Sequence, residues 1–425
     1  MARGIGAPKG TYDVLPEQQP LRRWIESRAA DVFQRYGYGR LDTPVFEDSG
    51  LFVRGVGEST DIVRKEMYTF EDLGGRSLTL RPEGTASAAR AYVEHGMHTL
   101  PQPVKLWYHW PMFRYESPQS GRYRQHYQFG IEAFGSESAY LDAEVIGVLQ
   151  AFYQEIGLEG LELRLNSMGC RECRPVYTEK LRSFLQRSDA TFCSECRIRT
   201  EMNPLRVFDC KVPTCKTSLA QAPRLTDFLC EDCAEHYEKV AEGLRMQGII
   251  FFEDHTLVRG MDYYTRTTFE FQSDVLGAQS GIGGGGRYDY LVESIGGKPT
   301  SGVGFGTGVE RIVLALEAIR DDLPQVTGPC AYVVAMDDRC RHAAFQLAHE
   351  LRTAGIAIDL DHVERSVKGQ MKQAGRSGAD YALILGPDEL AANSVTLKKL
   401  RSGEENVVNR NQVAENLVCG GEGRA

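Results

Sequence analysis

Apolar residues in the first part of the chain follow two patterns, one helical and one strand-like. Two stripes at helical spacing predict helices: Leu21, Trp24, Ile25, Val32 and Phe33 in the first, and Val145, Ile146, Leu149, Phe152, Tyr153 and Ile156 in the second. An alanine-rich run at 86–93 predicts a third helix. Shorter apolar runs predict strands at 40–47, 76–80, 104–109 and 130–134. Pro44 cannot donate a ladder hydrogen bond, so 40–47 is expected at an edge or an interface.

A later stretch, LVRGMDYYTRTTFEF at 257–271, joins a polar loop to a strand. Strict alternation predicts a strand whose buried face consists of Thr265, Thr267, Phe269 and Phe271. The segment before it lacks that alternation and carries Arg259. An arginine at such a junction suits phosphate or carboxylate, because its planar guanidinium donates two parallel hydrogen bonds.

Glycine-rich and alternating segments organise the last part of the chain. SGIGGGGR at 280–287 predicts irregular backbone that can approach a ligand closely. SGVGFGTG at 301–308 predicts a strand, and a helix follows it. A linker is expected at 321–329. Beyond it an alternation predicts a small α/β domain, with strands at 331–335, 356–360 and 381–385 and helices near 342–351 and 365–376.

Composition and charge narrow the class of protein. The chain has 425 residues, 42% of them hydrophobic and 25% charged, which predicts two or three globular domains with buried cores. No apolar run is long enough for a membrane span, and the start lacks a signal-peptide core, so we expect a cytoplasmic protein without membrane contact. The net charge of −9 excludes a globally basic nucleic-acid binder but allows a local basic groove.

Eight of the eleven cysteines lie in close pairs within a charged segment, at about 167–248, that is predicted to be a mainly helical insertion. The pairs are Cys170/Cys173, Cys193/Cys196, Cys210/Cys215 and Cys230/Cys233. This spacing is typical of zinc ligands, and four pairs are enough for two Cys₄ sites. It fits reduced thiols on separate helices equally well, so the sequence leaves the metal open.

Three separated stretches resemble the three motifs of class II aminoacyl-tRNA synthetases. They are the strand ending at Pro44, the strand, arginine loop and strand at 113–134, and the glycine-rich strand followed by GVERIVLAL with Arg311. Neither glycine run fits a dinucleotide-binding turn or a P-loop, so any nucleotide is held in another way. Within the class, LVRGMDYYT at 257–265 and SGIGGGGRYDYLVESIGG at 280–297 resemble the signatures of bacterial-type histidyl-tRNA synthetases. RPEGT at 81–85 and the opening KGTYDVLP extend the resemblance to nearly the whole chain.

The resemblance implies an α+β fold in two domains. Residues 1–325 are expected to form a class II catalytic domain, an antiparallel sheet flanked by helices and interrupted by the cysteine-rich insertion. Residues 329–425 are expected to form an α/β anticodon-binding domain. There Arg365, Lys368, Lys372 and Arg376 recur at helical spacing and form either a phosphate-binding or a solvated face. The resemblance also implies a homodimer with Pro44 near its interface.

The activity implied is that of a histidine–tRNA ligase. Such an enzyme activates L-histidine with ATP to histidyl-adenylate and pyrophosphate, then transfers histidine to the 3′ end of tRNA(His). Cations aimed at the α-phosphate are natural catalysts, because two anions must meet there. By resemblance, Arg114 is expected on the α-phosphate, Arg311 on the γ-phosphate, and Arg259 on the α-phosphate and the histidine carboxylate. Glu116 is expected beside ATP and its Mg²⁺, and Gln119 and Arg122 near the tRNA.

The chemistry of the substrate predicts which groups a histidine pocket needs. Neutral imidazole offers one donor and one acceptor, so a selective pocket needs an acceptor and a donor in return. Glu132 and Tyr264 match the imidazole-reading residues of the family. The other residues that match its amino-acid site are Glu83, Gly84, Thr85, Gln128 and Tyr263, besides Arg114 and Arg259.

The sequence departs from the family at two points and leaves two other functions to weigh. Ser117 stands where the family commonly has an arginine, and His126-Tyr127 where it commonly has Phe-His.

The first alternative function is that of a regulatory subunit of ATP phosphoribosyltransferase, which Arg259 and the C-terminal domain disfavour. The second is another class II synthetase, such as the threonine or proline enzyme, which the Glu132 and Tyr264 pair disfavours.

Overall fold

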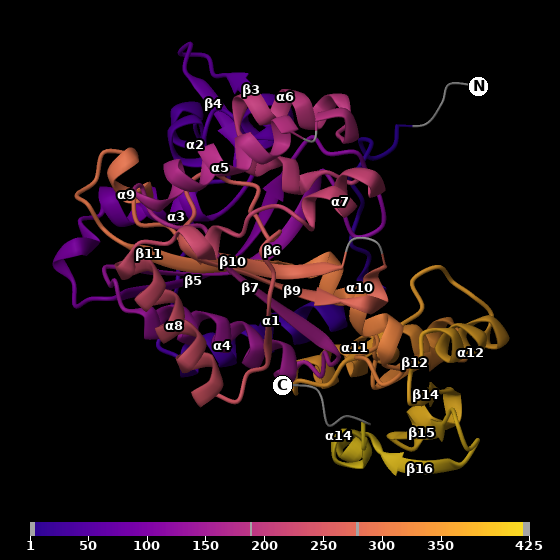
Figure 1. The fold of residues 1–425 in the computed structure, drawn as a ribbon. Helices are drawn as coiled ribbons and strands as arrows, with labels where there is room; N and C mark the ends of the chain where they lie inside the picture. The colour runs from indigo at the N-terminus through magenta and orange to yellow at the C-terminus, as the bar shows by residue number, and fades with distance from the viewer. Residues whose placement is uncertain (1–4, 188, 278–279, 420–425) are drawn as a thin grey trace. The chain divides into compact units, whose positions relative to one another are not determined.

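The computed structural model describes residues 5–187, 189–277 and 280–419 (Figure 1). The outermost residues of both predicted domains and residue 188 of the predicted insertion lie outside this range. The chain forms two compact units, Met1–Pro324 and Gln325–Ala425. Both combine helices with a sheet, which confirms the predicted α+β class.

The first unit is built on a mainly antiparallel sheet. Among the described residues, eight strands pair in the order β1-β5-β6-β11-β10-β9-β7-β8. In that order their bounds are Gly39–Arg40, Val104–Phe113, Gln125–Phe134, Gly302–Gly308, Gly281–Arg287, Thr265–Ser273, Leu161–Ser167 and Phe251–Glu253. The pairs at the two edges, β1–β5 and β7–β8, are parallel, and the interior pairs are antiparallel.

Helices cover one face of this sheet and enclose the main hydrophobic core (Figure 1). They are α1 (Gln19–Arg35), α4 (Ala139–Glu155), α8 (Glu231–Met246) and α10 (Val309–Ile319). Both predicted apolar stripes lie in this core, where Phe33 and Phe129 each pack against Phe152 with ring centroids 5.6 Å apart. The opposite side of the sheet is bordered by smaller elements: α2 (Ser49–Val56), α3 (Thr85–Glu94), α9 (Leu291–Ser294) and a small sheet of β2 (Phe46–Asp48), β4 (Ser77–Leu80) and β3 (Tyr68–Glu71).

The strand predicted at 40–47 is wrong as a single element. Its two ends form β1 and β2, which belong to different sheets. Around Pro44 the backbone carbonyls bond a side chain instead of a neighbouring strand: the guanidinium of buried Arg81 donates to the carbonyls of Thr43 at 3.1 Å and Pro44 at 3.3 Å. The proline therefore separates two strands instead of lying inside one.

The glycine run was predicted to be too irregular for a strand, which is wrong, because 281–287 is the strand β10 in the middle of the sheet. Its register with β9 nevertheless shifts between Gly281 and Gly283 and between Gly286 and Arg287. A Cβ at Gly285 would lie 1.9 Å from the carbonyl oxygen of Gly304 in β11. A Cβ at Gly284 would lie 2.5 Å from that of Phe269 in β9. Glycine is thus required by the close approach of both neighbouring strands, and their ladders keep it extended.

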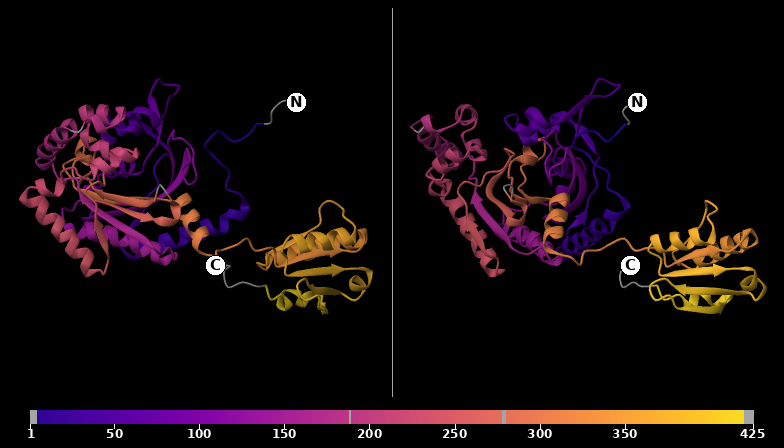
Figure 2. Two further views of the ribbon diagram at one scale, coloured as in Figure 1. Left: turned by 45° about the vertical axis from the view of Figure 1, so that its right-hand side comes forward. Right: turned by 90° about the vertical axis from the view of Figure 1, so that its right-hand side faces the viewer.

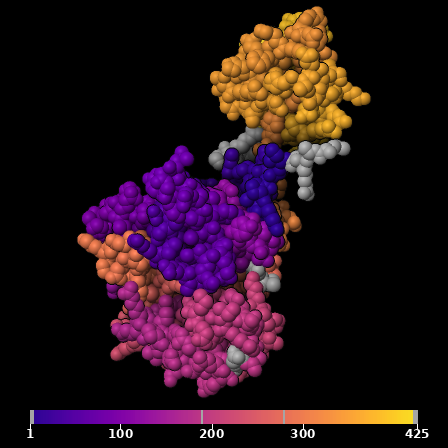
Figure 3. All heavy atoms as spheres, turned by 90° about the horizontal axis from the view of Figure 1, so that it is seen from above, coloured from indigo at the N-terminus to yellow at the C-terminus, as the bar shows by residue number. Residues whose placement is uncertain are grey.

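The segment between β7 and β8 is mainly helical. It contains α5 (Cys173–Arg187), α6 (Ser194–Met202), the 3₁₀-helix η5 (Pro204–Asp209), α7 (Pro213–Leu219) and finally α8. Figure 3 shows these residues, in pink, lying against earlier, violet residues of the same unit. Arg199 of α6 lies 3.8 Å from Asp61, so the insertion reaches the segment after α2.

The C-terminal unit is a five-stranded sheet, counted over its described residues, with helices packed on it (Figure 2). Its elements are β12 (Ala331–Ala335), α11 (Asp338–Thr353), β13 (Ile358–Leu360), α12 (Val367–Arg376), β14 (Tyr381–Leu385), α13 (Pro387–Ala391), β15 (Ser394–Lys399), β16 (Glu405–Asn409) and α14 (Val413–Asn416). Alternate residues of β12 pack under α11 and under α12, which confirms the predicted strand–helix alternation. The antiparallel pair β15–β16 was not predicted, and a disulfide joins Cys330 to Cys419.

A buried charge network ties the core helices of the first unit to the sheet. Asp142 of α4 and Arg287 at the end of β10 are fully buried and lie 3.0 Å apart through Nε and Oδ1. His236 of α8 lies 2.8 Å from the other oxygen of Asp142, and the Thr267 hydroxyl of β9 donates to it. Burial alone would raise the pKa of Asp142, but the charge of Arg287 and these hydrogen bonds hold the pKa below its usual value.

Replacing Asp142 with alanine should therefore destabilise the first unit by about 3–5 kcal/mol, because Arg287 would stay buried without its charge partner. Urea unfolding followed by tryptophan fluorescence measures the effect. The matched control is Asp322→Ala, since Asp322 forms an exposed pair with Arg320. That control should leave the unfolding midpoint nearly unchanged, and equal midpoints for both variants would contradict the assignment.

Candidate active site

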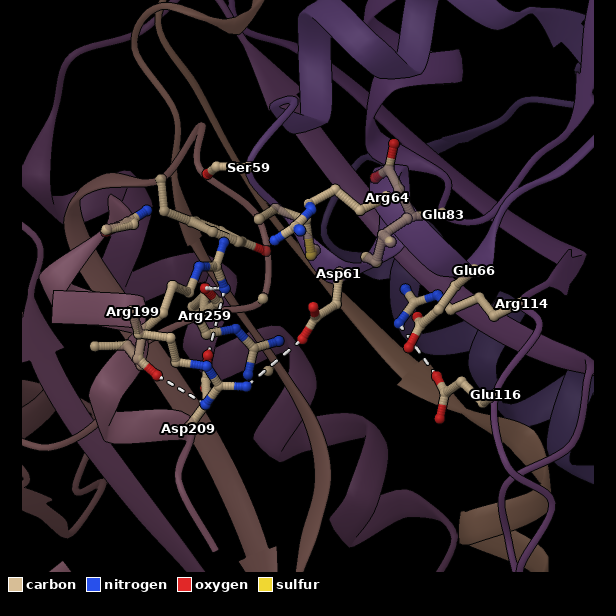
Figure 4. A pocket seen from close by; sticks show the side chains of 18 of the residues that line it. Ser59, Asp61, Arg64, Glu66, Glu83, Arg114, Glu116, Arg199, Asp209 and Arg259 are labelled. Atoms are coloured by element: carbon tan, nitrogen blue, oxygen red, sulfur yellow. Dashed lines mark hydrogen bonds and ion pairs between the residues drawn. The ribbon is translucent and has the colours of Figure 1, made fainter. Parts of the chain in front are cut away.

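A polar cleft of about 760 Å³ lies on the sheet face opposite the main core (Figure 4). The strand alternation explains its polarity. In β6, Phe129 and Ile131 point into the core, so Gln128 and Glu132 point the other way. A smaller cavity of about 210 Å³ shares Arg114, Gln128 and other lining residues with it, so the two form one continuous site.

Three arginines from separate elements line this site. Arg114 follows β5, and its Nε donates to the carbonyl of Pro82 at 2.7 Å. Arg311 lies in the first turn of α10, and its Nε donates to the carbonyl of Gly281 at 2.7 Å. Arg259 comes from the loop before β9. Figure 4 shows Arg114 and Arg259 on opposite sides of the cleft. The structure thus brings together the three arginines predicted to be catalytic.

Glu270 on β9 positions Arg259, although it was not predicted as a site residue. Its carboxylate accepts from Nη1 of Arg259 at 2.9 Å. The Nε of Arg259 is buried and has no hydrogen-bond partner among the described residues. A sequence signal existed, because Glu270 lies on the strand face opposite Phe269 and Phe271. The pair leaves a buried donor for an anionic ligand to satisfy.

Glu83 organises the start of α3. Its two oxygens accept from the backbone N–H groups of Thr85 at 2.8 Å and Ala86 at 2.9 Å, and the Tyr263 hydroxyl lies 3.3 Å away. Burial raises the pKa of Glu83, although these hydrogen bonds oppose the shift. Glu83, Gly84 and Thr85 all line the cleft, so the RPEGT motif presents both a helix N-terminus and a carboxylate to it.

Glu132 is completely buried behind the cleft wall. Its carboxylate accepts from the hydroxyls of Thr85 at 2.7 Å and Tyr108 at 3.1 Å, and from that of Tyr288. Burial raises its pKa to about 8, against the effect of these hydrogen bonds. Tyr108 and Tyr288 were not predicted as site residues, because nothing local in the sequence shows that their hydroxyls converge on Glu132.

The predicted residues differ in how they reach the cleft. Those that line the cleft or the smaller cavity are Glu83, Gly84, Thr85, Arg114, Glu116, Arg122, Gln128, Arg259, Tyr264 and Arg311. Glu132 and Tyr263 lie behind its wall. Gln119 bonds the backbone of Arg122 across the loop tip and does not line either cavity. Glu310 reaches the smaller cavity, but its carboxylate already accepts from the Tyr12 hydroxyl at 2.8 Å and the Tyr127 backbone N–H at 3.1 Å.

Comparison with known proteins gives a consistent result over nearly the full chain. A family model described as histidyl-tRNA synthetase matches residues 10–312, and one described as an anticodon binding domain matches residues 330–419. The histidine–tRNA ligase of Moorella thermoacetica is 51% identical over 94% of this chain and 95% of that protein. That of Dehalococcoides mccartyi is 49% identical over 97% and 98%. The crystal structure of apo S. aureus histidyl-tRNA synthetase is 39% identical, with a TM-score of 0.81, and covers 97% of this chain and 100% of that one.

Across the described ranges, no helix has both the length and the apolar character needed to cross a bilayer.

The raised pKa of Glu132 predicts a pH-dependent stability for the ligand-free protein. The unfolded chain releases this proton near pH 4.5, whereas the folded state keeps it until about pH 8. The contribution of this carboxyl to the free energy of unfolding is therefore fully present below pH 4.5 and is lost as the pH rises through 8, by an amount on the order of 5 kcal/mol. Glu132→Gln cannot ionise, so it should flatten this decline. Thermal melting at pH 5.5 and pH 8 tests the expectation, and an identical decline in both proteins would contradict it.

Proposed function

The chain belongs to the histidyl-tRNA synthetase family, and we propose that it joins histidine to tRNA through an adenylate formed in the cleft of Figure 4. The observation that carries the proposal is the convergence of Arg114, Arg259 and Arg311 on one continuous site. Attack of the histidine carboxylate on the α-phosphorus brings two anions together. Fixed cations lower that barrier without reorganising during the reaction.

The positions of the arginines suggest how the triphosphate lies. Arg114 and Arg259 line the region that the two cavities share, so we assign the α-phosphate to it. Arg311 lines only the smaller cavity, to which we assign the γ-phosphate. Glu270 holds one end of the Arg259 guanidinium and so directs its unpartnered Nε toward the reacting carboxylate and phosphate.

The histidine side chain is assigned to the end of the larger cavity next to α3. Tyr264 lines the cleft there and offers a hydroxyl to the imidazole. Glu132 is the proposed second reader, and the hydroxyls of Thr85 and Tyr108 stand between it and the cleft. Direct contact therefore requires one of them to give up its bond to Glu132. The α-ammonium is assigned to Glu83, Thr85 and Gln128, with Gly84 and Tyr263 shaping the wall.

ATP is proposed to bind with Mg²⁺, which is held mostly by phosphates and one or two carboxylates. Glu116 is the carboxylate that fits best, because it lines the region that the two cavities share and its charged neighbours, Arg114 and Arg122, lie 3.8 Å and 3.5 Å away. Glu270 and Glu310 fit less well, since their oxygens already accept hydrogen bonds from protein groups. When bound, the cation offsets phosphate charge, and the chain's own residues orient the two substrates.

The proposed partners besides histidine and ATP are tRNA(His) and a second copy of the chain. The tip of the 114–125 loop, with Gln119 and Arg122, is proposed to meet the acceptor end of tRNA(His). The C-terminal unit is proposed to bind the anticodon, with the basic side chains of and beside α12, Arg365 to Arg376, on its phosphates. We further propose a homodimer with Pro44 near its interface, working in the cytoplasm where tRNA is charged.

The direct test of the function is histidine-dependent exchange of pyrophosphate into ATP, followed by aminoacylation of tRNA(His). Exchange with histidine and with no other amino acid is the expected result. Exchange that depends on threonine or proline would indicate a different synthetase. An absence of exchange in folded, histidine-binding protein would favour the regulatory-subunit alternative.

Arg259→His should lower adenylate formation by at least about 10²–10³-fold, because the reacting phosphate loses a fixed cation. Histidine binding should be kept in part, since Tyr264 and Glu83 are unchanged. Single-turnover adenylate formation and calorimetric titration with histidine measure the two effects separately. Arg28→His is the control, because Arg28 lies on α1 in a partly exposed pair with Glu155. Near-normal adenylate formation by Arg259→His would remove Arg259 from the mechanism.

A further inference from the structure

The fold gathers the eight cysteines of the insertion into two separate clusters. Cluster A consists of Cys170, Cys173, Cys230 and Cys233, and cluster B of Cys193, Cys196, Cys210 and Cys215. Within each cluster the sulfur atoms all lie within 4.8 Å of one another. All eight are free thiols in the described chain. The sequence could not show this arrangement, because cluster A joins pairs that lie 60 residues apart, from Cys170 to Cys230.

The sulfur spacing is that of a tetrahedral metal site. Four sulfurs at about 2.3 Å from a central zinc ion lie about 3.8 Å from one another. The measured separations are 3.6 Å for Cys170–Cys173, 3.9 Å for Cys170–Cys230 and 3.8 Å for Cys193–Cys210. A disulfide requires about 2.05 Å. We propose that each cluster binds one structural Zn²⁺ through four thiolates.

Hydrogen bonds to the sulfurs support metal-bound thiolates. The backbone N–H of Cys230 donates to the sulfur of Cys173 at 3.0 Å, and that of Glu172 to the sulfur of Cys170 at 3.3 Å. In cluster B the backbone N–H of Cys193 donates to the sulfur of Cys215 at 3.3 Å. Such backbone donors stabilise the negative charge on metal-bound sulfur. Neutral thiols buried among apolar residues would gain little from them.

The ligand set favours zinc over other ions. Four thiolates satisfy a tetrahedral ion completely and leave no open position, as in structural zinc sites. In cluster B, Cys196, Cys210 and Cys215 are part of a hydrophobic core, whereas Cys193 and Cys210 also line the cleft. A closed set of four protein ligands describes a metal that stabilises the fold.

Each cluster lies beside an arginine that holds the loop carrying Arg259 and Tyr264. Arg174 follows Cys173 directly, and it donates to the carbonyls of Asp262, at 3.4 Å, and Tyr264. Arg206 lies in η5, between Cys196 and Cys210 of cluster B. It donates to the carbonyl of Arg259 at 2.9 Å and to the carboxylate of Asp262 at 2.7 Å.

Zinc in the insertion therefore positions the active-site loop from two directions. Cluster A fastens the first turn of α5 to the first turn of α8 and thereby fixes Arg174. Cluster B closes the segment around η5 and thereby fixes Arg206. Arg174 and Arg206 are positioning residues, since they contact the loop backbone or Asp262. The positioning of the active-site loop rests on the proposed function, whereas the metal content does not.

Metal analysis of the full-length protein, purified without chelator, tests the clusters. We expect two zinc ions per chain by plasma mass spectrometry. Cys233→Ser and Cys215→Ser should each lose one, and Cys340→Ser should keep both, because Cys340 is a buried free cysteine of the C-terminal unit. Iron in place of zinc, near-zero zinc in the unaltered chain, or zinc loss equal in all three variants would overturn the proposal.

A second measurement covers variants that do not fold. Titration of the unaltered protein's thiols with a mercurial reagent should release two zinc ions, detected with a chromogenic chelator. The release should follow modification of the insertion cysteines, mapped by mass spectrometry. Zinc released while those cysteines stay unmodified would overturn the assignment.

The positioning role is tested by Arg206→Gln in the zinc-loaded protein. The loop should lose alignment, so kcat for pyrophosphate exchange should fall about tenfold or more while the zinc content stays at two. Arg182→Gln, at a partly exposed arginine of α5 paired with Glu179, is the control and should leave kcat unchanged. An unchanged kcat for Arg206→Gln would overturn the role. Zinc without any exchange would refute the proposed function and leave the metal sites standing.

Discussion

The close approach of glycine backbone at the centre of the large sheet is the constraint on which the site depends. β10 and β11 carry glycine at the positions that face the cleft, and functional side chains occupy the space that a Cβ would fill. A Cβ at Gly284 would lie 3.0 Å from Nη1 of Arg259, and one at Gly304 would lie 2.0 Å from a carboxylate oxygen of Glu132. A Cβ at Gly286 would lie 3.0 Å from the ring of Tyr264. The absence of side chains on these strands thus leaves room for long polar side chains to pack against the backbone of the sheet.

The same sheet separates an apolar core from a polar cleft. One face meets the phenylalanine-rich core under α1 and α4, and the other holds the cleft with its arginines and carboxylates. Some buried charges are matched, as Asp142 is by Arg287 and His236. Buried Glu83 has only uncharged hydrogen-bond partners, and so has Glu132, whose partners are hydroxyls. Burial without a charged partner accounts for the raised pKa of both carboxyls.

Periodic patterns in the sequence predicted the elements whose environment is uniform along their length. The stripe in α4 is observed, and so is the burial of Thr265, Thr267, Phe269 and Phe271. The strand is interrupted near its start, where Arg266 has a positive φ of 45° and the register with β10 shifts. The glycine run was predicted wrongly because its strand conformation comes from ladders with β9 and β11, which local propensity does not contain. Glu270 was missed although its partner Arg259 is only 11 residues away in the chain. The tyrosines around Glu132 were missed for a related reason. They acquire their roles from partners far away in the chain, as Tyr288 does from Glu132, and the arginines were found through a family resemblance.

The loop from Arg259 to Tyr264 shows how catalysis and architecture meet in this chain. It has no regular secondary structure, and its backbone is held by contacts with other segments. The N–H of Asp262 donates to the carbonyl of Val56 at 3.0 Å, and the carbonyls of Arg259 and Tyr264 accept from Arg206 and Arg174 of the insertion. The rigidity of the loop therefore depends in part on the elements that carry those arginines. The elements α6, η5 and α7 of the insertion are short, and cross-links between such elements are a physical means of making them stiff. The cysteine clusters lie where that stiffness is required.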